Sequence, residues 1–472
     1  MQTGDGVRSA SEPVVDERMR RATITMVMLN SVATAMMLSA VNVALPNVAR
    51  DLHLTATLLS WVPMSYLMAS AACVLPFGRL ADMYGRKRIF LLGNGGVIAA
   101  SLVTACAVGT VSLICGRLLQ GVSAAMVFAT NIAIVTSVFP PARRGVAVGY
   151  TISAVYFGLA LGPLLSGWLI EFHSWRATFV VHVPLAVIVL YIGLTRLPIE
   201  WRADERGDFD PLGAVLNAIA MVVLMTGVSN LPGSGAAAMV VAGLACGWLF
   251  FRHEHRHPHP LFDVELFYTN RVFTMSCLAS LVMYTTTFAN VVLISLFLQY
   301  LKNTPPSTTG LVMIAQPVMM TLLSPLAGRL SDRIEPRIIA SAGMAVTALG
   351  LAALATLGPT SSLTTVVGCL LTTGVGFSLF SSPNVNAIMG TVGRNDYGRV
   401  ASAISVARVV GQMSSMGLVA MVMALWVGPV HIEPAVYPQL ACAISTCFGI
   451  GAALCACGIG LSLARGRMHG PV

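Results

Sequence analysis

Long apolar segments alternate with short polar ones along almost the whole chain. Runs without a charged residue cover 22–49, 54–78, 89–116, 118–142, 145–170, 272–301, 303–328 and 434–464. Each run exceeds the roughly 20 residues that a helix needs to cross the hydrocarbon core of a bilayer. Two further stretches, 177–195 and 400–426, continue the pattern, the second with one arginine. The pattern predicts an all-α polytopic membrane protein.

Two other apolar runs are too long for a single crossing. The run 211–251 contains a Pro, Gly and Ser cluster at 231–235, and the run 338–393 contains a similar cluster at 358–362. Such clusters interrupt helices and form turns. Each long run therefore divides into two helices, and we expect fourteen spans in total.

The composition supports this interpretation. Apolar residues make up 56% of the chain and charged residues only 10%, and the mean hydropathy is +0.79. Soluble domains carry about a quarter charged residues. A soluble protein has no place to bury this much apolar surface, so the bilayer must cover it.

The net charge of +9 would by itself suggest a nucleic-acid partner, but its distribution indicates membrane topology. If fourteen crossings start from a cytoplasmic N-terminus, most of the 28 Lys and Arg residues fall on the cytoplasmic side. Arg50, Arg176 and Lys302 fall outside, and Arg117 and Arg408 lie within spans. This asymmetry follows the positive-inside rule. We expect a multi-pass protein of the plasma (inner) membrane with both termini cytoplasmic and no nucleic-acid partner.

A short motif occurs twice and indicates duplication. The sequence Gly-Arg-Leu-Ala-Asp at 78–82 returns as Gly-Arg-Leu-Ser-Asp at 328–332. Two related bundles that rock about a central site are typical of secondary transporters. The predicted parts are a cytoplasmic tail (1–21), a first six-helix bundle (22–197), a charged loop with two additional helices and a polar linker (198–271), a second six-helix bundle (272–464) and a second cytoplasmic tail (465–472). The additional helices are expected to face lipid, and the protein to be a monomer.

The first copy of the motif is a candidate conformational latch, made of Gly78, Asp82, Gly85 and Arg86. Asp82 and Arg86 are four residues apart, and the glycines allow close helix approach. A carboxylate at a helix end can pair with an arginine or a neighbouring helix dipole and so hold one conformation. The alternative is a basic loop that only anchors topology. The second copy has Glu335-Pro336 where the first has Gly85-Arg86, which predicts a weaker latch.

Two candidate sites lie inside the predicted spans. An arginine within a bilayer is costly unless it faces a cavity or a partner, and Arg117 is followed by Gln120 on the same helical face. This pair belongs to a coupling site or, alternatively, to a structural hydrogen-bond hub. Arg408 and Gln412, one turn apart, are the corresponding candidates in the second bundle. The predicted packing and hinge residues of the fifth helix are Gly158, Gly162, Pro163 and Gly167.

These segments resemble signatures of the major facilitator superfamily. Residues 78–88 are similar to its cytoplasmic-loop signature, 113–121 to its fourth-helix signature, and 158–167 to a fifth-helix signature of exporters, with Ser166 in place of a glycine. Asp210 at the start of the seventh helix resembles the fourteen-helix drug:proton antiporter family (DHA2). Further matching stretches are 41–46, 175–176, 382–384 and 408–411.

The resemblance implies a major facilitator fold with alternating access and proton-coupled efflux of small organic or amphipathic compounds. It implies a role for Arg117 in proton coupling or in the central cavity. Polar residues expected to line that cavity are Asn42, Arg117, Tyr156, Asn290, Gln316, Arg408 and Gln412. No constellation of enzymatic groups and no cofactor site is found, so an enzyme is not expected. An importer or facilitator of a neutral or anionic metabolite on the same fold is the alternative, and a non-transporting membrane sensor is a remote one.

The chain departs from the family pattern in its first helix. Family members commonly carry an aspartate four residues before the Val41-Asn42 pair, where this chain has Met37. Acidic groups within membranes serve as proton carriers and as counter-charges for cations. No other carboxylate lies deep in a predicted span. We therefore hypothesise a neutral, amphipathic or anionic substrate, with Arg117 and Arg408 giving the cavity a positive potential.

Histidines are the remaining candidates. His253, His255, His257 and His259 alternate in the polar linker beside two prolines, which favours a solvated linker over a metal site. His182 in the sixth helix is expected to be a structural histidine, although an imidazole can titrate near neutral pH. No metal site is predicted.

Overall fold

The computed structural model describes residues 16–201, 208–262, 264–331, 333–390 and 397–466, and within them every regular element is helical. The first helices are α1 (Glu17–Asp51), α2 (Ala56–Tyr84), α3 (Arg86–Ala105), α4 (Thr110–Val138), α5 (Pro141–Phe172), η1 (Trp175–Phe179), α6 (Val183–Thr195), α7 (Pro211–Ser229) and α8 (Ala236–Glu254). The later helices are α9 (Glu265–Thr269), α10 (Arg271–Thr287), α11 (Asn290–Leu296), η2 (Phe297–Leu301), α12 (Pro306–Met313), α13 (Ala315–Ser331), α14 (Pro336–Ala355), α15 (Leu363–Met389), α16 (Tyr397–Trp426), η4 (Pro434–Val436) and α17 (Tyr437–Ala464).

These helices build 14 segments long and apolar enough to cross a membrane, which confirms the predicted number. The two long apolar runs divide where the sequence predicted, between α7 and α8 and between α14 and α15. Some spans consist of several helical pieces. Arg271–Leu301 joins α10, α11 and the π-helical turn η2, and Pro306–Ser331 joins α12 and α13.

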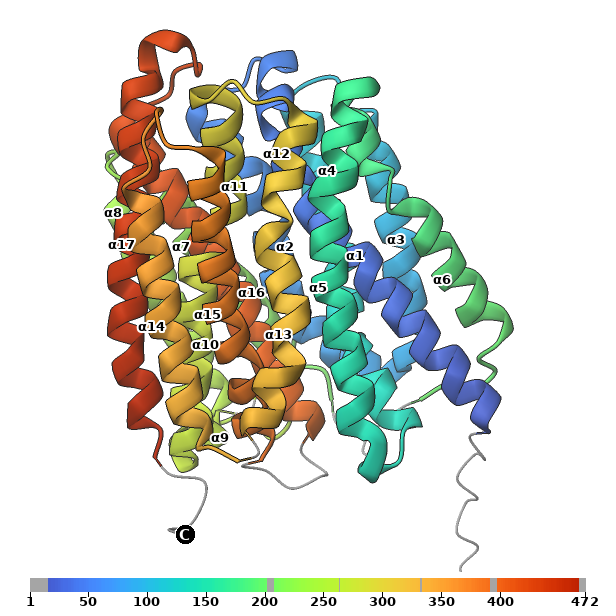
Figure 1. Cartoon of the computed structure of the whole chain (residues 1–472). Helices are drawn as coiled ribbons and strands as arrows, with labels where there is room; N and C mark the ends of the chain where they lie inside the picture. Colours follow the sequence, from blue (N-terminus) through green and yellow to red (C-terminus); the bar gives the residue numbers. More distant parts are fainter. Residues whose placement is uncertain (1–15, 202–207, 263, 332, 391–396, 467–472) are drawn as a thin grey trace, which may run out of the picture.

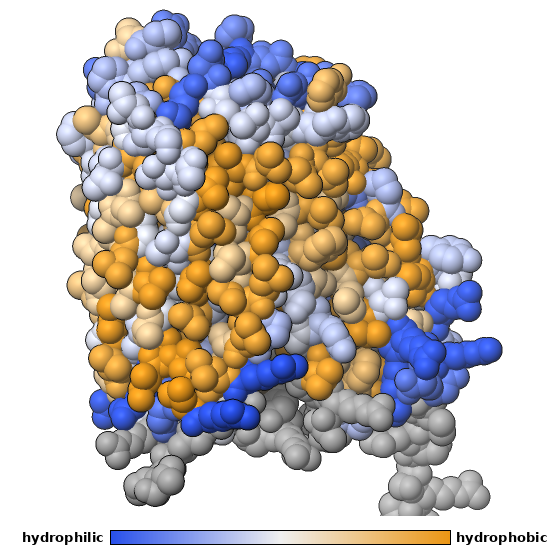
Figure 2. Space-filling view, in the orientation of Figure 1, coloured by the Kyte–Doolittle hydropathy of each residue, from blue (hydrophilic) through white to orange (hydrophobic). Residues whose placement is uncertain are grey.

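The long helices lie side by side and run between the two ends of the molecule (Figure 1). The start of α1 and the end of α17 lie at the same end, which we call the terminal side; the other end is the opposite side. On the face shown in Figure 2, a broad apolar belt lies between two hydrophilic ends. This distribution is expected of a protein whose waist is covered by lipid.

The helices form two groups. Helices α1 to α6 pack on one another, with α1 against α5 and α2 against α4, and we call them the first bundle. Helices α10 to α17 form the second bundle, in which α14 packs on α15 and α17, and α10 packs on α16. The bundles meet along a seam where α2 contacts α16, α5 contacts α12 and α13, and α1 contacts α11. The internal duplication and the residue boundaries of the bundles stay predictions.

The additional pair α7 and α8 is attached to this seam. Asn217 of α7 donates hydrogen bonds to the carbonyls of Ala71 and Ala72 on α2, at 3.4 and 3.0 Å. The other side of α7 contacts α16. Helix α8 packs mainly on α7 and exposes large apolar side chains such as Leu244 and Trp248. The expected peripheral position therefore describes α8, whereas α7 contacts both bundles.

Candidate functional site

Arg117 is fully buried inside the first bundle. Its Nε donates to the carbonyl of Val62 on α2 at 3.0 Å, and its NH1 group donates to Oε1 of Gln120 at 2.7 Å. The guanidinium also lies over the ring of Tyr66, 4.6 Å from the ring centre, a cation–π contact. Among the described residues, Arg117 forms no ion pair. Neutral dipoles and an aromatic face thus hold this buried guanidinium.

The Arg117 contacts extend to two further helical segments. Gln120 Nε2 donates to Ser101 Oγ on α3 at 2.9 Å, and Ser101 Oγ lies 3.0 Å from His182 Nε2, directly before α6. The hydrogen-bond hub that the sequence left open is therefore present, and it includes His182. The arrangement also places a buried, charged group on α4 beside α2, which contacts the second bundle through α16.

Five residues from four helices meet at the seam and form what we call the central cluster: Tyr156, Tyr284, Phe377, Ser381 and Arg408. Tyr156 OH on α5 lies 2.8 Å from Ser381 Oγ on α15, a hydrogen bond between the two bundles. Phe377 packs edge-on against Tyr156 and Tyr284, with ring centres 6.4 and 5.6 Å apart. The cluster therefore combines aromatic faces with hydroxyl groups.

Arg408 of α16 supplies the positive charge of the central cluster. Its guanidinium lies 5.5 Å from the ring centre of Phe128 on α4, so it faces the first bundle. It also interacts electrostatically with the hydroxyl groups of Tyr66, Tyr156 and Tyr284. The Arg408 guanidinium therefore lies near three tyrosine side chains that come from both bundles.

The other predicted cavity residues are distributed around the seam. Asn42 and Asn290 are buried, and each has a side-chain atom, Asn42 Oδ1 and Asn290 Nδ2, without a hydrogen-bond partner among the described residues. Gln316 of α13 is buried, and Gln412 of α16 is half-buried. Only Tyr156 and Arg408 of the predicted cavity set belong to the central cluster. The Asn42 amide is unpaired only at Oδ1, because its Nδ2 donates to the Leu38 carbonyl at 3.3 Å.

Sequence reasoning missed several residues of this site. Tyr66, Tyr284 and Phe377 stand in ordinary apolar runs, and nothing in their local sequence distinguishes them from packing residues. Ser381 is adjacent to the recognised stretch 382–384, which was a usable signal. Asn384 in that stretch has a structural role, because its Oδ1 accepts from Arg465 at 2.8 Å. Burial lowers the pKa of Arg465 to about 10, so this guanidinium stays charged at neutral pH.

Gln299 connects the bundles near the opposite side and was also missed. It lies in the π-helical turn η2, a geometry often found at functional sites. Its Nε2 donates to the carbonyl of Val43 on α1 at 2.9 Å, and its Oε1 accepts from Asn47 at 3.3 Å. Next to it, Tyr300 OH donates to the carbonyl of Pro46 at 3.4 Å. These bonds join α1 to the second bundle on this side.

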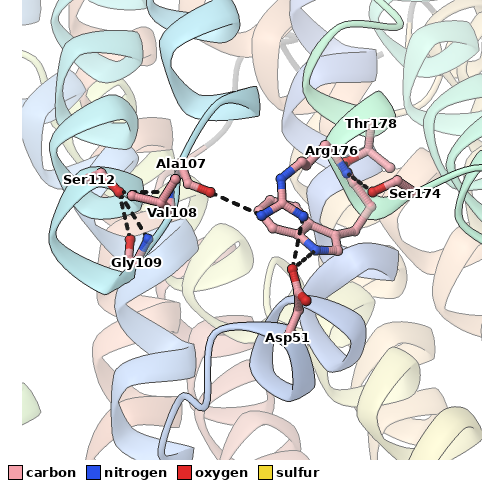
Figure 3. Close-up of polar contacts among 9 residues, drawn as sticks. Asp51, Ala107, Val108, Gly109, Ser112, Ser174, Arg176 and Thr178 are labelled. Atoms are coloured by element: carbon pink, nitrogen blue, oxygen red, sulfur yellow. Dashed lines mark hydrogen bonds and ion pairs between the residues drawn. The ribbon is translucent and has the colours of Figure 1, made fainter.

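A second set of contacts on the opposite side fixes the first bundle internally. Asp51 at the end of α1 accepts from Trp175 Nε1 at 2.8 Å and from Arg176 NH1 at 2.9 Å (Figure 3). Arg176 also donates to the carbonyl of Ala107 at 3.2 Å, after α3. The Trp175-Arg176 motif therefore holds together the ends of α1 and α3.

The predicted latch residues lie on the terminal side between α2 and α3. Asp82 and Arg86 form an ion pair at 2.9 Å, and Arg86 NH1 also donates to Ser137 on α4 at 2.8 Å. Gly85 has a φ of 119°, and a side chain there would collide with the carboxylate of Glu200. Glu200 Oε1 in turn accepts from the Lys87 amide at 2.8 Å, at the start of α3. That this loop acts as a latch stays a prediction.

The glycine strip of α5 faces two different helices. Gly158 and Gly162 lie directly on the backbone of α1, while Gly167 lies on Pro306 at the start of α12. Pro163 lies against Gly310 of α12. Since α12 belongs to the second bundle, the strip packs within one bundle and also across the seam. Its role as a hinge stays a prediction.

Two expectations concern the polar segments. His253 and His257 are half-buried, and His253 Nε2 lies 2.8 Å from Oδ2 of Asp210, the N-cap of α7, so the solvated linker stays a prediction for these two histidines. His255 and His259 are exposed, as predicted. Asp332 of the repeated motif lies outside the described residues.

Comparison with known proteins identifies the family. The model of the Major Facilitator Superfamily matches residues 27–413, and a second match covers 275–467. The chain belongs to the Major Facilitator Superfamily. It is therefore a membrane transporter and not an enzyme.

Two similar proteins are named as a vitamin transporter and as a drug-resistance protein. The chain is 29% identical over 354 residues to the riboflavin transporter RibZ of Clostridioides difficile, covering 75% of this chain and 77% of that protein. It is 30% identical over 407 residues to the multidrug resistance protein Stp of Mycobacterium tuberculosis, covering 84% and 75%. The fold is similar to that of a bacterial homologue of the human lysosomal transporter Spinster, with a TM-score of 0.68, 14% identity and coverage of 95% and 97%.

Proposed function

We propose that this transporter exports small neutral or anionic, amphipathic organic compounds by alternating access, coupled to proton entry. It acts as a monomer of the fourteen-helix drug:proton antiporter family in the plasma (inner) membrane. Its terminal side faces the cytoplasm. The substrate binds at the seam between the bundles, where the central cluster and the amides of Asn42 and Asn290 supply the contacts.

The observation that carries the proposal is the environment of Arg408. The guanidinium lies among tyrosines and phenylalanines from both bundles, and it forms no ion pair among the described residues. In a low-dielectric site, an uncompensated guanidinium attracts anionic or electron-rich groups and repels cations. Aromatic faces bind the apolar part of an amphipathic molecule.

The proposed direction of transport rests on the names of similar proteins, and the proposed energy source rests on the contacts of Arg117. Stp of M. tuberculosis is named a multidrug resistance protein, and LfrA of Mycolicibacterium smegmatis, 28% identical over 367 residues, is named a multidrug efflux pump. These names support export of organic compounds. The buried Arg117, held by neutral partners on α2 and α4, supports a coupling role, because its hydrogen bonds must rearrange if these helices move.

The test is transport of paired substrates in everted membrane vesicles with an imposed pH gradient. Anionic and cationic dyes of similar size are compared in the wild type, in Arg408→Gln and in Arg252→Gln. Arg252 is the matched control because it is exposed and stacks on Trp248 at 5.3 Å. We expect gradient-dependent accumulation of the anionic dye, a fall of at least tenfold in Arg408→Gln, and no change in Arg252→Gln.

Two outcomes would contradict the proposal. If cationic dyes are preferred, or if Arg408→Gln moves the anionic dye as fast as the wild type, the assigned substrate class is wrong. If the dye accumulates only in right-side-out vesicles, or without a pH gradient, the protein is an importer or a facilitator.

A further inference from the structure

A cluster of metal-ligating side chains lies at the terminal side of the additional helices. Asp210 is the N-cap of α7, His253 lies in the last turn of α8, and His257 follows that helix. One ligand atom from each of the three lies within 4.8 Å of the other two. His253 Nε2 is 2.8 Å from Asp210 Oδ2, and the two imidazole rings are 5.4 Å apart. Asp210 thus meets a pair of histidines, the nearer of which is 43 positions away in the sequence.

The two carboxylate oxygens of Asp210 contact different partners. Oδ1 accepts from the Gly213 amide at 2.9 Å and caps α7. Oδ2 points to His253 and is not needed for the cap. The carboxylate can therefore hold a cation through Oδ2 without loss of the helix cap.

A second carboxylate, that of Glu254, faces the same cluster. Glu254 is 2% exposed, and its Oε2 accepts from the Phe262 amide at 3.1 Å. Its Oε1 is buried without a hydrogen-bond partner among the described residues. A Cβ on Gly213 would collide with both Glu254 Oε1 and Asp210 Oδ2, so these two oxygens lie over the same glycine. A buried carboxylate oxygen without a donor, such as Glu254 Oε1, is costly, and a cation beside it relieves this cost.

We propose that Asp210, His253 and His257 bind a divalent transition metal ion, with Glu254 beside it as a fourth ligand or a partner of a bound water. Two imidazoles with carboxylate oxygens form a mixed donor set that suits Zn²⁺ in tetrahedral geometry. Ligand atoms about 2.0–2.2 Å from zinc lie roughly 3.3 Å from one another. The ligand atoms of Asp210, His253 and His257, all within 4.8 Å of one another, are already close to this spacing.

The consequence of binding is a link between the two additional helices. The ion would join the first residue before α7 to the last turn of α8 and to the linker that follows. This assignment does not depend on the transported substrate, because no residue of the site belongs to the central cluster.

The experiment uses the full-length protein purified in detergent with a tag that contains no histidine. Co²⁺ is titrated and followed by its visible absorption, and Zn²⁺ is then added in competition. We expect one Co²⁺ per chain, displaced by Zn²⁺, with affinity reduced at least tenfold in His253→Gln and in His257→Gln. Asp210→Asn is the third variant, since asparagine retains the helix cap but removes the charge.

The neighbouring histidines are matched controls. His255 is exposed and contacts Tyr268, and His259 is exposed. His255→Gln and His259→Gln should bind Co²⁺ as the wild type does, and Zn²⁺ should raise the melting temperature of both. Absence of saturable binding in the wild type, or equal loss in all four histidine variants, would overturn the proposal. Binding that survives in the His253→Gln/His257→Gln double variant would also overturn it.

Discussion

The side-chain amides of Asn47 and Gln299 lie 3.3 Å apart, across the seam between the two bundles. Gln299 also donates to Val43 on the same helix as Asn47, so one side chain makes both contacts. These bonds must break if the bundles separate on the opposite side during alternating access.

Removal of this connection should favour opening of the opposite side. Each hydrogen bond contributes about 0.5–1.5 kcal/mol and Gln299→Ala removes both, so the variant should shift the equilibrium toward the open form by roughly five- to 150-fold. Distances between spin labels on α1 and α11 would measure the shift. Gln439→Ala is the matched control, because Gln439 is exposed near the start of α17. An unchanged distance distribution in Gln299→Ala would show that these bonds do not hold the side closed.

The two glycines of the predicted latch should respond differently to alanine. Gly85→Ala introduces a side chain at a φ of 119° and against Glu200, and the backbone strain alone costs about 1–2 kcal/mol. Gly78→Ala meets only the Ala129 methyl group, at an ordinary contact distance of 3.9 Å. Gly85→Ala should therefore lower the melting temperature, and Gly78→Ala should not.

Transport measurements on the same pair test the latch itself. If Gly78 must approach another helix in a second conformation, Gly78→Ala should slow transport while the melting temperature is retained. Normal transport by Gly78→Ala would indicate that the loop only anchors topology.

Arg117→Lys should impair transport although the charge is kept. Lysine cannot reproduce the planar fork that donates to Val62 and Gln120 at the same time. We expect a loss of at least tenfold in vesicle transport with the protein still folded, as judged by its elution in size-exclusion chromatography. Arg252→Lys, on an exposed site, serves as the control. Wild-type transport by Arg117→Lys would mean that only the positive charge is required.

The contact of Asp51 with Trp175 and Arg176 should make a modest contribution to stability. The side chains of Arg176 and Asp51 are 39% and 48% exposed, and such pairs are worth about 0.2–1 kcal/mol. Asp51→Asn should lower the melting temperature slightly, with less effect at high salt, whereas Glu433→Gln at another exposed acidic position should not. A loss of melting temperature in Asp51→Asn that is insensitive to salt would assign the effect to the indole hydrogen bond.

The span count was predictable from the sequence, because the length of an apolar run and the thickness of a bilayer together determine a crossing. The helix breaks at 231–235 and 358–362 were predictable for an equally local reason, since proline and glycine act on their own backbone. The contact between Asp82 and Arg86 was predictable only from their separation of four residues, because Gly85 ends α2 between them with a φ of 119°.

The rest depends on contacts between residues distant in sequence. Asn47 and Gln299 are 252 positions apart, and Tyr156 and Ser381 are 225 apart. Neither pair has a local pattern, because each forms only when two bundles dock. The contact of His253 could not be predicted for the same reason, because its partner is Asp210, which the sequence places in a separate motif.

The position of α7 has a consequence for the transport cycle. Asn217 fastens this helix to α2, whereas its contact with α16 includes Met225 packed on Gly417 and has no such anchor among the described hydrogen bonds. When the two bundles move relative to each other, α7 should travel with α2 and slide past α16 at the contact of Met225 and Gly417. Side chains of α7 at this contact would then affect the barrier between the two conformations, and so the turnover rate, without contacting the substrate.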